Sequence, residues 1–251
     1  MTPAISLLMS PDNGDKIVKV AKEMGIDHFE IVCDKPVPKG INVISAQSLF
    51  NGLSIGNLFT DDETYEYAQI LIKRINKYYI ENNCHNFVFG SPKNRNIYTL
   101  DDFFESISFF RMVCHGIPED AIVSLENNPA EYGTNYGTYA EQCYKIADVV
   151  NMPNFKVNLD LGGLFKAGDS EDVIPFIFDE RWLVNHIHIS RFNLLPISEL
   201  SQEEIIAYQK VFQTIKNYGY DNTVSLEVNF KGKLTDDFIK KEITIFKEII
   251  Q

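Results

Sequence analysis

The chain has 251 residues, of which 45% are hydrophobic, and its formal net charge is −12. These values predict a soluble globular protein with a large core, and the acidic balance argues against a nucleic-acid-binding face, which would be basic. The four cysteines are scattered without a CxxC pair, which indicates reduced thiols rather than a disulfide framework or a zinc knuckle. There is no apolar run of ~18 residues and no signal-peptide pattern. We therefore expect a cytoplasmic protein that contacts neither nucleic acid nor membrane.

Strand-like and helix-like stretches alternate along the whole chain. Short apolar runs predict eight strands, at residues 4–10, 29–33, 41–45, 87–90, 122–126, 155–160, 184–190 and 223–228. Apolar residues at helical spacing predict helices at residues 14–24, 61–82, 100–114, 139–150, 172–178, 202–218 and 236–250. A repeat of roughly 30 residues suits an eight-fold barrel, whereas the competing doubly wound sheet lacks its glycine fingerprint. We predict one α/β domain over residues 1–251, a single (β/α)8 TIM barrel.

Four of the later predicted strands end on a side chain that can bind a metal. These residues are Glu126, Asp160, His188 and Glu227, which are separated by 34, 28 and 39 positions. Such separations exclude a local motif, so the four side chains can meet only at the carboxyl ends of neighbouring barrel strands. Three carboxylates at one point would repel one another strongly, and a divalent cation would remove that repulsion.

Alternation along these strands places a second polar residue on the face of each candidate ligand. Two positions before the ligands stand Ser124, Asn158, His186 and Ser225, with an apolar residue between each pair. In a barrel these residues would form a polar layer in the lumen that orients the ligands above it. The second strand has the same pattern, with His28 and Glu30 on its inward face.

This donor set predicts a metal-assisted reaction. Three carboxylates and one imidazole suit Mn²⁺, Mg²⁺ or Co²⁺ better than a closed zinc site. Such a metal would polarise a substrate carbonyl and acidify the adjacent C–H. Glu126 and Glu227 could then remove and return the proton as general base and acid. The pattern therefore favours aldose–ketose isomerisation or ketose epimerisation.

Over nearly its whole length the chain resembles the xylose-isomerase-like TIM barrels, the sugar and sugar-phosphate isomerase/epimerase group. The segments that carry the resemblance are HFEIV, AQSLFNG, VFGSPKNR, VSLENNP, NLDLGG, HIHIS and SLEVNF. The resemblance implies one divalent cation held by Glu126, Asp160, His188 and Glu227, with the two glutamates as the acid–base pair. It also implies that Glu30 contacts a small sugar-like substrate, and it is compatible with a homodimer.

Two positions depart from the pattern of this family. Gly163 stands where a histidine often follows the strand-six aspartate, and residues 189–192 (ISRF) replace an acid and an arginine usual in the epimerases. These departures leave the metal set intact and leave the identity of the sugar open. With Gly163 and five histidines in total, the chain cannot supply the three-zinc site of the related endonuclease IV proteins.

Further substrate contacts are predicted at the same rim. The turn at residues 90–95 (GSPKNR) offers an anion clamp, in which Arg95 holds a phosphate or carboxylate and Ser91 adds a hydroxyl. An ordinary turn with solvated cations is the competing interpretation. Arg191 is a second candidate for substrate binding, and His186 is a candidate polar contact.

Two other features leave alternatives open. The loop at residues 127–139, rich in Asn, Gly and Tyr, predicts either a lid or wall of the pocket or a plain turn-rich connection. Trp182 is expected to pack in the core or at the rim.

Two other functions fit the same residues. A lyase could dehydrate a keto-inositol-type substrate with the same metal and glutamate pair. Alternatively, the barrel could bind a sugar-like ligand without turnover, which is a function of another class. The presence of all four ligands and both acid–base candidates favours an isomerase or epimerase over these alternatives.

Overall fold

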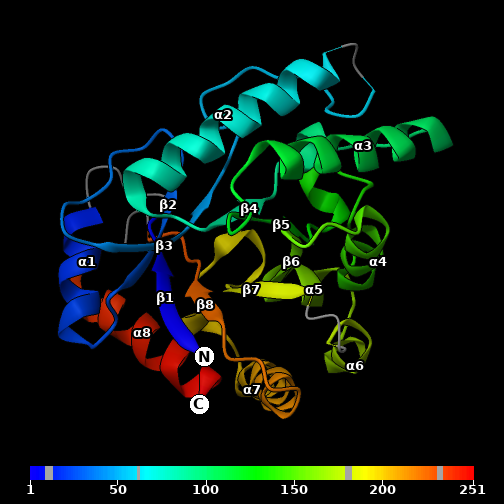
Figure 1. Ribbon diagram of the computed structural model, residues 1–251. Helices are drawn as coiled ribbons and strands as arrows, with labels where there is room; N and C mark the ends of the chain where they lie inside the picture. The colour runs from blue at the N-terminus through cyan, green and yellow to red at the C-terminus, as the bar shows by residue number, and fades with distance from the viewer. Residues whose placement is uncertain (9–13, 61–62, 179–182, 231–233) are drawn as a thin grey trace.

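The computed structural model describes residues 1–8, 14–60, 63–178, 183–230 and 234–251. In this described part, eight parallel strands form a closed barrel in which each strand pairs with the next and the last pairs with the first (Figure 1). The strands are β1 (Thr2–Ser6), β2 (His28–Val32), β3 (Asn42–Gln47), β4 (Asn86–Phe89), β5 (Ile122–Glu126), β6 (Phe155–Asp160), β7 (Val184–Ile189) and β8 (Thr223–Leu226). The predicted (β/α)8 barrel is confirmed.

Helices surround the outside of the barrel (Figure 1). They are α1 (Gly14–Glu23), α2 (Thr64–Asn82), α3 (Leu100–Gly116), α4 (Ala140–Val150), α5 (Leu161–Lys166), α6 (Ile174–Ile177), α7 (Gln202–Asn217) and α8 (Asp236–Ile250). The connections contain the short 3₁₀ turns η1 (Pro92–Asn94), η2 (Ala130–Tyr132), η3 (Glu171–Val173), η4 (Phe192–Leu194) and η5 (Ile197–Glu199). The turns η1, η2 and η4 follow β4, β5 and β7, so they lie at the carboxyl end of the barrel, where barrel enzymes carry their sites.

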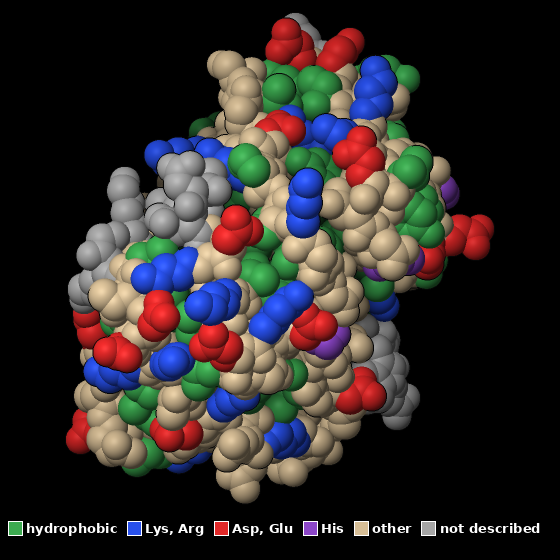
Figure 2. All heavy atoms as spheres, turned by 90° about the vertical axis from the view of Figure 1, so that its left-hand side faces the viewer, with side chains coloured by type: hydrophobic (Ala, Val, Ile, Leu, Met, Phe, Trp, Pro, Cys, Tyr) green, Lys and Arg blue, Asp and Glu red, His purple; other side chains and the backbone are tan. Residues whose placement is uncertain are grey.

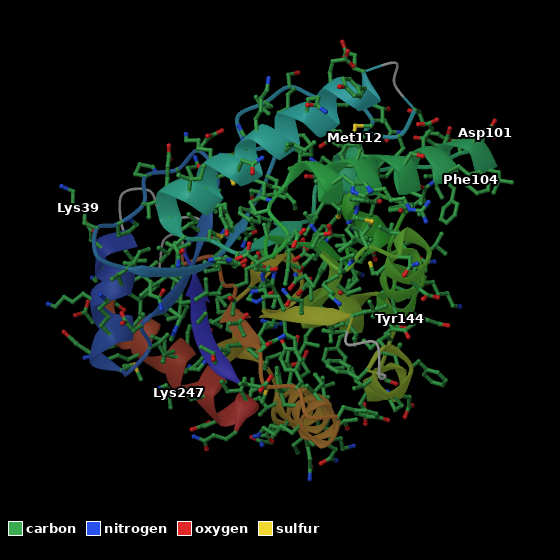
Figure 3. All side chains as sticks on the ribbon, in the orientation of Figure 1. Lys39, Asp101, Phe104, Met112, Tyr144 and Lys247 are labelled. Carbon is green, nitrogen blue, oxygen red and sulfur yellow. The ribbon has the colours of Figure 1, made fainter. Side chains whose placement is uncertain are left out.

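The lumen of the barrel is unusually polar. Barrels of this kind ordinarily fill their interior with branched aliphatic side chains. Here the buried polar residues on the strands include Ser6, Glu30, Ser45, Asn86, Ser124, Asn158, His186 and Ser225. Hydrogen bonds across the lumen link several of them, as between Ser124 Oγ and Asn86 Oδ1 at 2.7 Å. Oxygen and nitrogen atoms accordingly crowd the centre of the barrel (Figure 3).

The strand register shifts between β2 and β3 and again between β6 and β7, which adjusts the side chains that enter the lumen. Between β6 and β7, Val157 pairs with Val184 but Asn158 pairs with His186, which leaves Asn185 as an extra residue. Such bulges re-aim side chains near functional sites. Asn185 Nδ2 consequently lies 2.9 Å from Asn86 Oδ1, while His186 still lies level with Asn158.

The connection after β6 differs from the prediction. A helix was expected only at residues 172–178, but α5 begins directly after β6, and the expected stretch is divided between η3 and α6. The six residues of α5 (LGGLFK) are too few, and too rich in glycine, to show helical periodicity. The outer ends of the strand predicted at residues 4–10 and of the helix predicted at residues 61–82, together with Trp182, lie outside the described residues.

The surface of the protein carries side chains of both charges. On the face that carries α1, Lys and Arg side chains are interspersed with Asp and Glu (Figure 2). Within the described ranges, none of the helices has both the length and the apolar character needed to cross a bilayer.

The burial of the four cysteines predicts chemically inert thiols. Burial raises the pKa of Cys33, Cys114 and Cys143 to about 12, and it also raises the pKa of Cys84. Because the thiolate is the reactive form, an aromatic disulfide reagent at pH 8 should leave all four thiols of the native chain unmodified for many minutes. After denaturation it should titrate four thiols per chain. Rapid modification of the native protein would contradict the buried placement.

Candidate metal centre

The ends of β5, β7 and β8 bring three of the four expected ligands together. Glu126, His188 and Glu227 each offer an atom within 4.8 Å of the others. His188 Nδ1 lies 2.8 Å from Glu126 Oε1 and 3.2 Å from Glu227 Oε2. The His188 side chain is completely buried, and the two glutamate side chains are only 13% and 6% exposed. Two carboxylates therefore face one nitrogen of one imidazole.

A cavity of about 350 Å³ lies beside this group. It is lined by Leu8, Gln47, Ser48, Val88, Gly90, Ser91, Pro92, Glu126, Asn128, Tyr132, Asp160, Asn193, Leu194 and Glu227. Its volume falls within the range of small-molecule sites. Among these described lining residues, the charged ones are all carboxylates.

Glu30 fixes the orientation of His188 by binding Nε2, the imidazole nitrogen that does not face Glu126 and Glu227. The Oε2 atom of Glu30 lies 3.0 Å from His188 Nε2 and 3.3 Å from His186 Nε2, and Gln47 Nε2 donates to its Oε1 at 2.7 Å. Although burial alone would raise it, the pKa of Glu30 is held well below its usual value by His188 and His186. Burial opposes protonation of His188, but the charges of Glu227 and Glu30 raise its pKa well above the ordinary value. Glu30 is completely buried and supports His188, instead of facing the cavity as the resemblance implied.

Amide side chains position the two glutamates. Asn158 Nδ2 donates to Glu126 Oε1 and Asn128 Nδ2 donates to Glu126 Oε2, both at 2.8 Å. Gln47 Nε2 lies 2.9 Å from Glu227 Oε1. Burial raises the pKa of Glu227, whereas hydrogen bonds from His188 and Asn128 lower that of Glu126 against the effect of burial.

Asp160 lines the cavity but is not part of the three-residue group. It is the N-cap of α5, and its two carboxylate oxygens accept hydrogen bonds from the N–H groups of Gly162 and Gly163 at 3.1 and 2.9 Å. Burial, followed by the neighbouring charges of Glu126 and Glu227, raises the pKa of Asp160 well above its usual value. Each of its oxygens keeps a lone pair beyond these bonds, so its role as a fourth ligand stays a prediction.

Arg95 is placed behind the site instead of in the cavity. Its side chain is completely buried, and its guanidinium donates to the main-chain carbonyls of Phe89 at 3.3 Å and Glu126 at 2.8 Å. The expected anion clamp is therefore absent at this position, because both ends of the fork are directed at strand ends. Arg95 is the C-cap of the turn η1, which begins at Ser91 in a left-handed conformation with φ of 48°.

The three remaining predicted contacts lie in three different places. Ser91 lines the cavity, and its contact with a substrate stays a prediction. Arg191 pairs with Glu199 at 3.2 Å and lines a separate cavity between α5 and α7. His186 lies below the site, where its Nε2 is 3.1 Å from Ser225 Oγ.

Several lining residues were missed by sequence reasoning. Gln47 lies two residues beyond Ser45 on β3, so the same alternation identifies it once the strand is extended past residue 45. Tyr132 belongs to the loop predicted as a lid or wall, whereas Tyr136 of the same loop is buried against Ser106. The pocket residues contributed by η4 carry no periodic signal, because an irregular turn places them.

Comparison with known proteins identifies the family. A family model described as xylose isomerase-like TIM barrel matches residues 18–249. The chain belongs to this family. This confirms the resemblance drawn from the sequence. A search of curated proteins finds no match.

Solved structures with the same fold have diverse names. The chain is similar to L-ribulose 3-epimerase, with a TM-score of 0.78, 13% identity and coverage of 98% of this chain and 93% of that one. It is similar to the IolI protein with a binding zinc atom, with a TM-score of 0.72, 16% identity and coverage of 100% of this chain and 98% of that one. It is also similar to AP endonuclease, family 2, from Brucella melitensis, with a TM-score of 0.73, 17% identity and coverage of 95% of this chain and 97% of that one. At such identities the likeness shows the fold alone.

The residues of the centre fit a divalent cation. Buried carboxylates that face one another are stable when a cation compensates their charge, and the charges of Glu126 and Glu227 add to the effect of burial in raising the pKa of Asp160. Carboxylate oxygens and one imidazole nitrogen are donors that divalent metals accept. In addition, the amide oxygens of Asn128 and Asn158 are buried without a hydrogen-bond partner in the described part of the chain. Both amides bind Glu126, so the spare acceptors lie at the same centre.

Gly90 leaves the space that the Glu126 carboxylate occupies. A Cβ at this position would lie 2.9 Å from Glu126 Oε2, which is too close for an ordinary contact. Gly90→Ala should therefore displace the carboxylate and weaken Mn²⁺ binding about tenfold or more, as measured by calorimetry. The control is Gly14→Ala, whose Cβ would meet Pro38 at 3.1 Å. Equal Mn²⁺ affinity in the two variants would contradict this placement of Glu126.

Arg95→Met should destabilise the fold. It leaves the buried carbonyls of Phe89 and Glu126 without their donors, and a hydrogen bond to a charged group contributes about 1.5–3 kcal/mol. We expect the free energy of unfolding in urea to fall by about 2 kcal/mol. Arg111 is the matched control, because it also donates to two main-chain carbonyls, those of Val149 and Val150. Unlike the contacts of Arg95, these contacts lie near the surface. Equal losses for Arg95→Met and Arg111→Met would show that burial of Arg95 adds nothing.

Proposed function

We propose that the protein is a divalent-metal-dependent isomerase or epimerase of a small sugar or sugar derivative. The observation that carries this proposal is the pairing of Glu126 and Glu227 around His188 Nδ1, beside a cavity of about 350 Å³. Proton transfer next to a carbonyl needs one group that accepts a proton and one that returns it. Two carboxylates on separate strands, both reaching one small cavity, provide that pair.

Glu126, His188 and Glu227 would hold the cation, with Asp160 as the predicted fourth ligand. Mn²⁺, Mg²⁺ and Co²⁺ suit this oxygen-rich donor set. When bound, the cation would polarise the carbonyl oxygen of the substrate and acidify the neighbouring C–H.

The side chains of the protein would move the proton. One glutamate accepts it from the carbon beside the carbonyl, and in an epimerisation the second returns a proton to the same carbon. In an isomerisation the proton is returned to the former carbonyl carbon, and the proton of the neighbouring hydroxyl moves to the former carbonyl oxygen. Asn128 and Gln47 hold one oxygen of Glu126 and Glu227 respectively, which limits the directions in which each carboxylate can act. Leu8, Val88 and Tyr132 supply an apolar part of the wall that restricts water.

Solvent exchange tests the proposal. The Mn²⁺-loaded protein is incubated with ketopentoses and ketohexoses in D₂O, and the sugars are examined by NMR. We expect deuterium at the carbon beside the carbonyl, with rates at least about 100-fold lower for Glu126→Gln and for Glu227→Gln. Glu105→Gln, an exposed change on α3, is the control and should leave the rate unchanged.

The same experiment separates the other two functions. A product that has lost water would indicate the lyase, which uses the same glutamate pair to expel a hydroxyl group. A sugar that binds without exchange would indicate a non-catalytic barrel. Either result would overturn the isomerase or epimerase assignment.

A further inference from the structure

The turn after β7 contains two consecutive residues with strained backbone. Asn193 and Leu194 of η4 have φ angles of 63° and 57°. Asparagine tolerates this left-handed region, but leucine rarely adopts it, because its Cβ approaches the following carbonyl oxygen. Both residues line the cavity that Glu126 and Glu227 also line. Strain of this kind persists only where surrounding contacts impose it, and it is concentrated at ligand sites.

Hydrogen bonds from other rim loops impose the conformation. The Tyr132 hydroxyl, from the loop after β5, accepts the N–H of Asn193 at 2.9 Å. The N–H of Asn229, after β8, donates to the carbonyl of Leu194 at 2.8 Å. Arg191 and Leu195, on either side of the turn, also exchange two main-chain hydrogen bonds, at 3.1 and 3.2 Å. The turn is thus held from both sides of the cavity mouth.

An aromatic stack braces the same turn. The rings of Phe192 and Tyr132 are nearly parallel, at 17°, with centroids 5.1 Å apart. Lys166 of α5 lies over the Phe192 ring at 5.1 Å and also pairs with Glu131 at 2.8 Å. These contacts connect three rim segments, η2, α5 and η4.

We propose that Leu194 is a specificity-determining residue, held by this strained turn as a wall that limits the length of the ligand. The inference rests on the proposed function in one respect, that the ligand is a small polyhydroxy compound. Leu194 is only half-buried, so packing in the core does not account for a leucine at a left-handed position.

Three substitutions separate strain from size. Leu194→Gly removes both the strain and the wall, and Leu194→Ala removes the wall but keeps the strain. Leu194→Asn keeps a side chain of similar size and tolerates the left-handed conformation. We expect the melting temperature to rise by about 2–4 °C for the Gly and Asn variants and not for the Ala variant. The control Asn151→Gly, at the left-handed C-cap of α4, should change neither ligand preference nor, by more than a degree or so, the melting temperature.

The decisive readout is the binding of unreactive alditols with five, six and seven carbons to the Mn²⁺-loaded protein, measured by calorimetry. We expect the wild type and Leu194→Asn to prefer the shortest alditol over the longest by about tenfold or more. That preference should largely disappear in Leu194→Gly and Leu194→Ala. An unchanged preference in these two variants, or no alditol binding at all, would overturn the proposal.

The proposed chemistry can fail separately. If no ketose exchanges deuterium but alditol binding follows the size of residue 194, the isomerase or epimerase assignment fails and the wall stands. If exchange occurs but the preference for length ignores residue 194, the wall fails and the chemistry stands.

Discussion

The contact between Glu30 and His188 determines the chemistry of this barrel. An imidazole has two nitrogens, and the group that one of them binds decides what the other can do. Glu30, completely buried on β2, lies 3.0 Å from His188 Nε2, so Nδ1 is the nitrogen that faces Glu126 and Glu227. Without this carboxylate the imidazole could rotate or change tautomer, and the two glutamates would lose the nitrogen around which they gather. Gln47 extends the same network from Glu30 to Glu227.

Glycine residues provide the room that the carboxylates need. Gly90 leaves space for Glu126, and a Cβ at Gly163 would lie 2.8 Å from Asp160 Oδ2 and 2.9 Å from the carbonyl of Asn127. A Cβ so close to these two oxygens leaves no room for the histidine that the resemblance led us to expect at this position. The departure seen in the sequence is thus a consequence of how α5 begins. The site therefore has its carboxylates but no histidine at position 163.

The regular parts of the fold and site could be predicted from the sequence. Strand alternation and the βα repeat together require that Glu126, His188 and Glu227 point into one lumen, and the structure brings them within 4.8 Å. Irregular backbone could not be predicted in this way. The direction of Arg95 depends on the left-handed Ser91, and the cavity wall at Leu194 depends on contacts from other loops. Neither leaves a periodic trace in the sequence.

We infer that one divalent cation binds at the Nδ1 side of His188 and that Glu30 orients the imidazole for it. Calorimetric titration of the chelator-treated protein with Mn²⁺, for the wild type and Glu30→Gln side by side, tests it most directly. We expect one ion per wild-type chain and an affinity about 10–100-fold lower for the variant. Absence of Mn²⁺ binding by the wild type, or equal affinities of the two proteins, would contradict it.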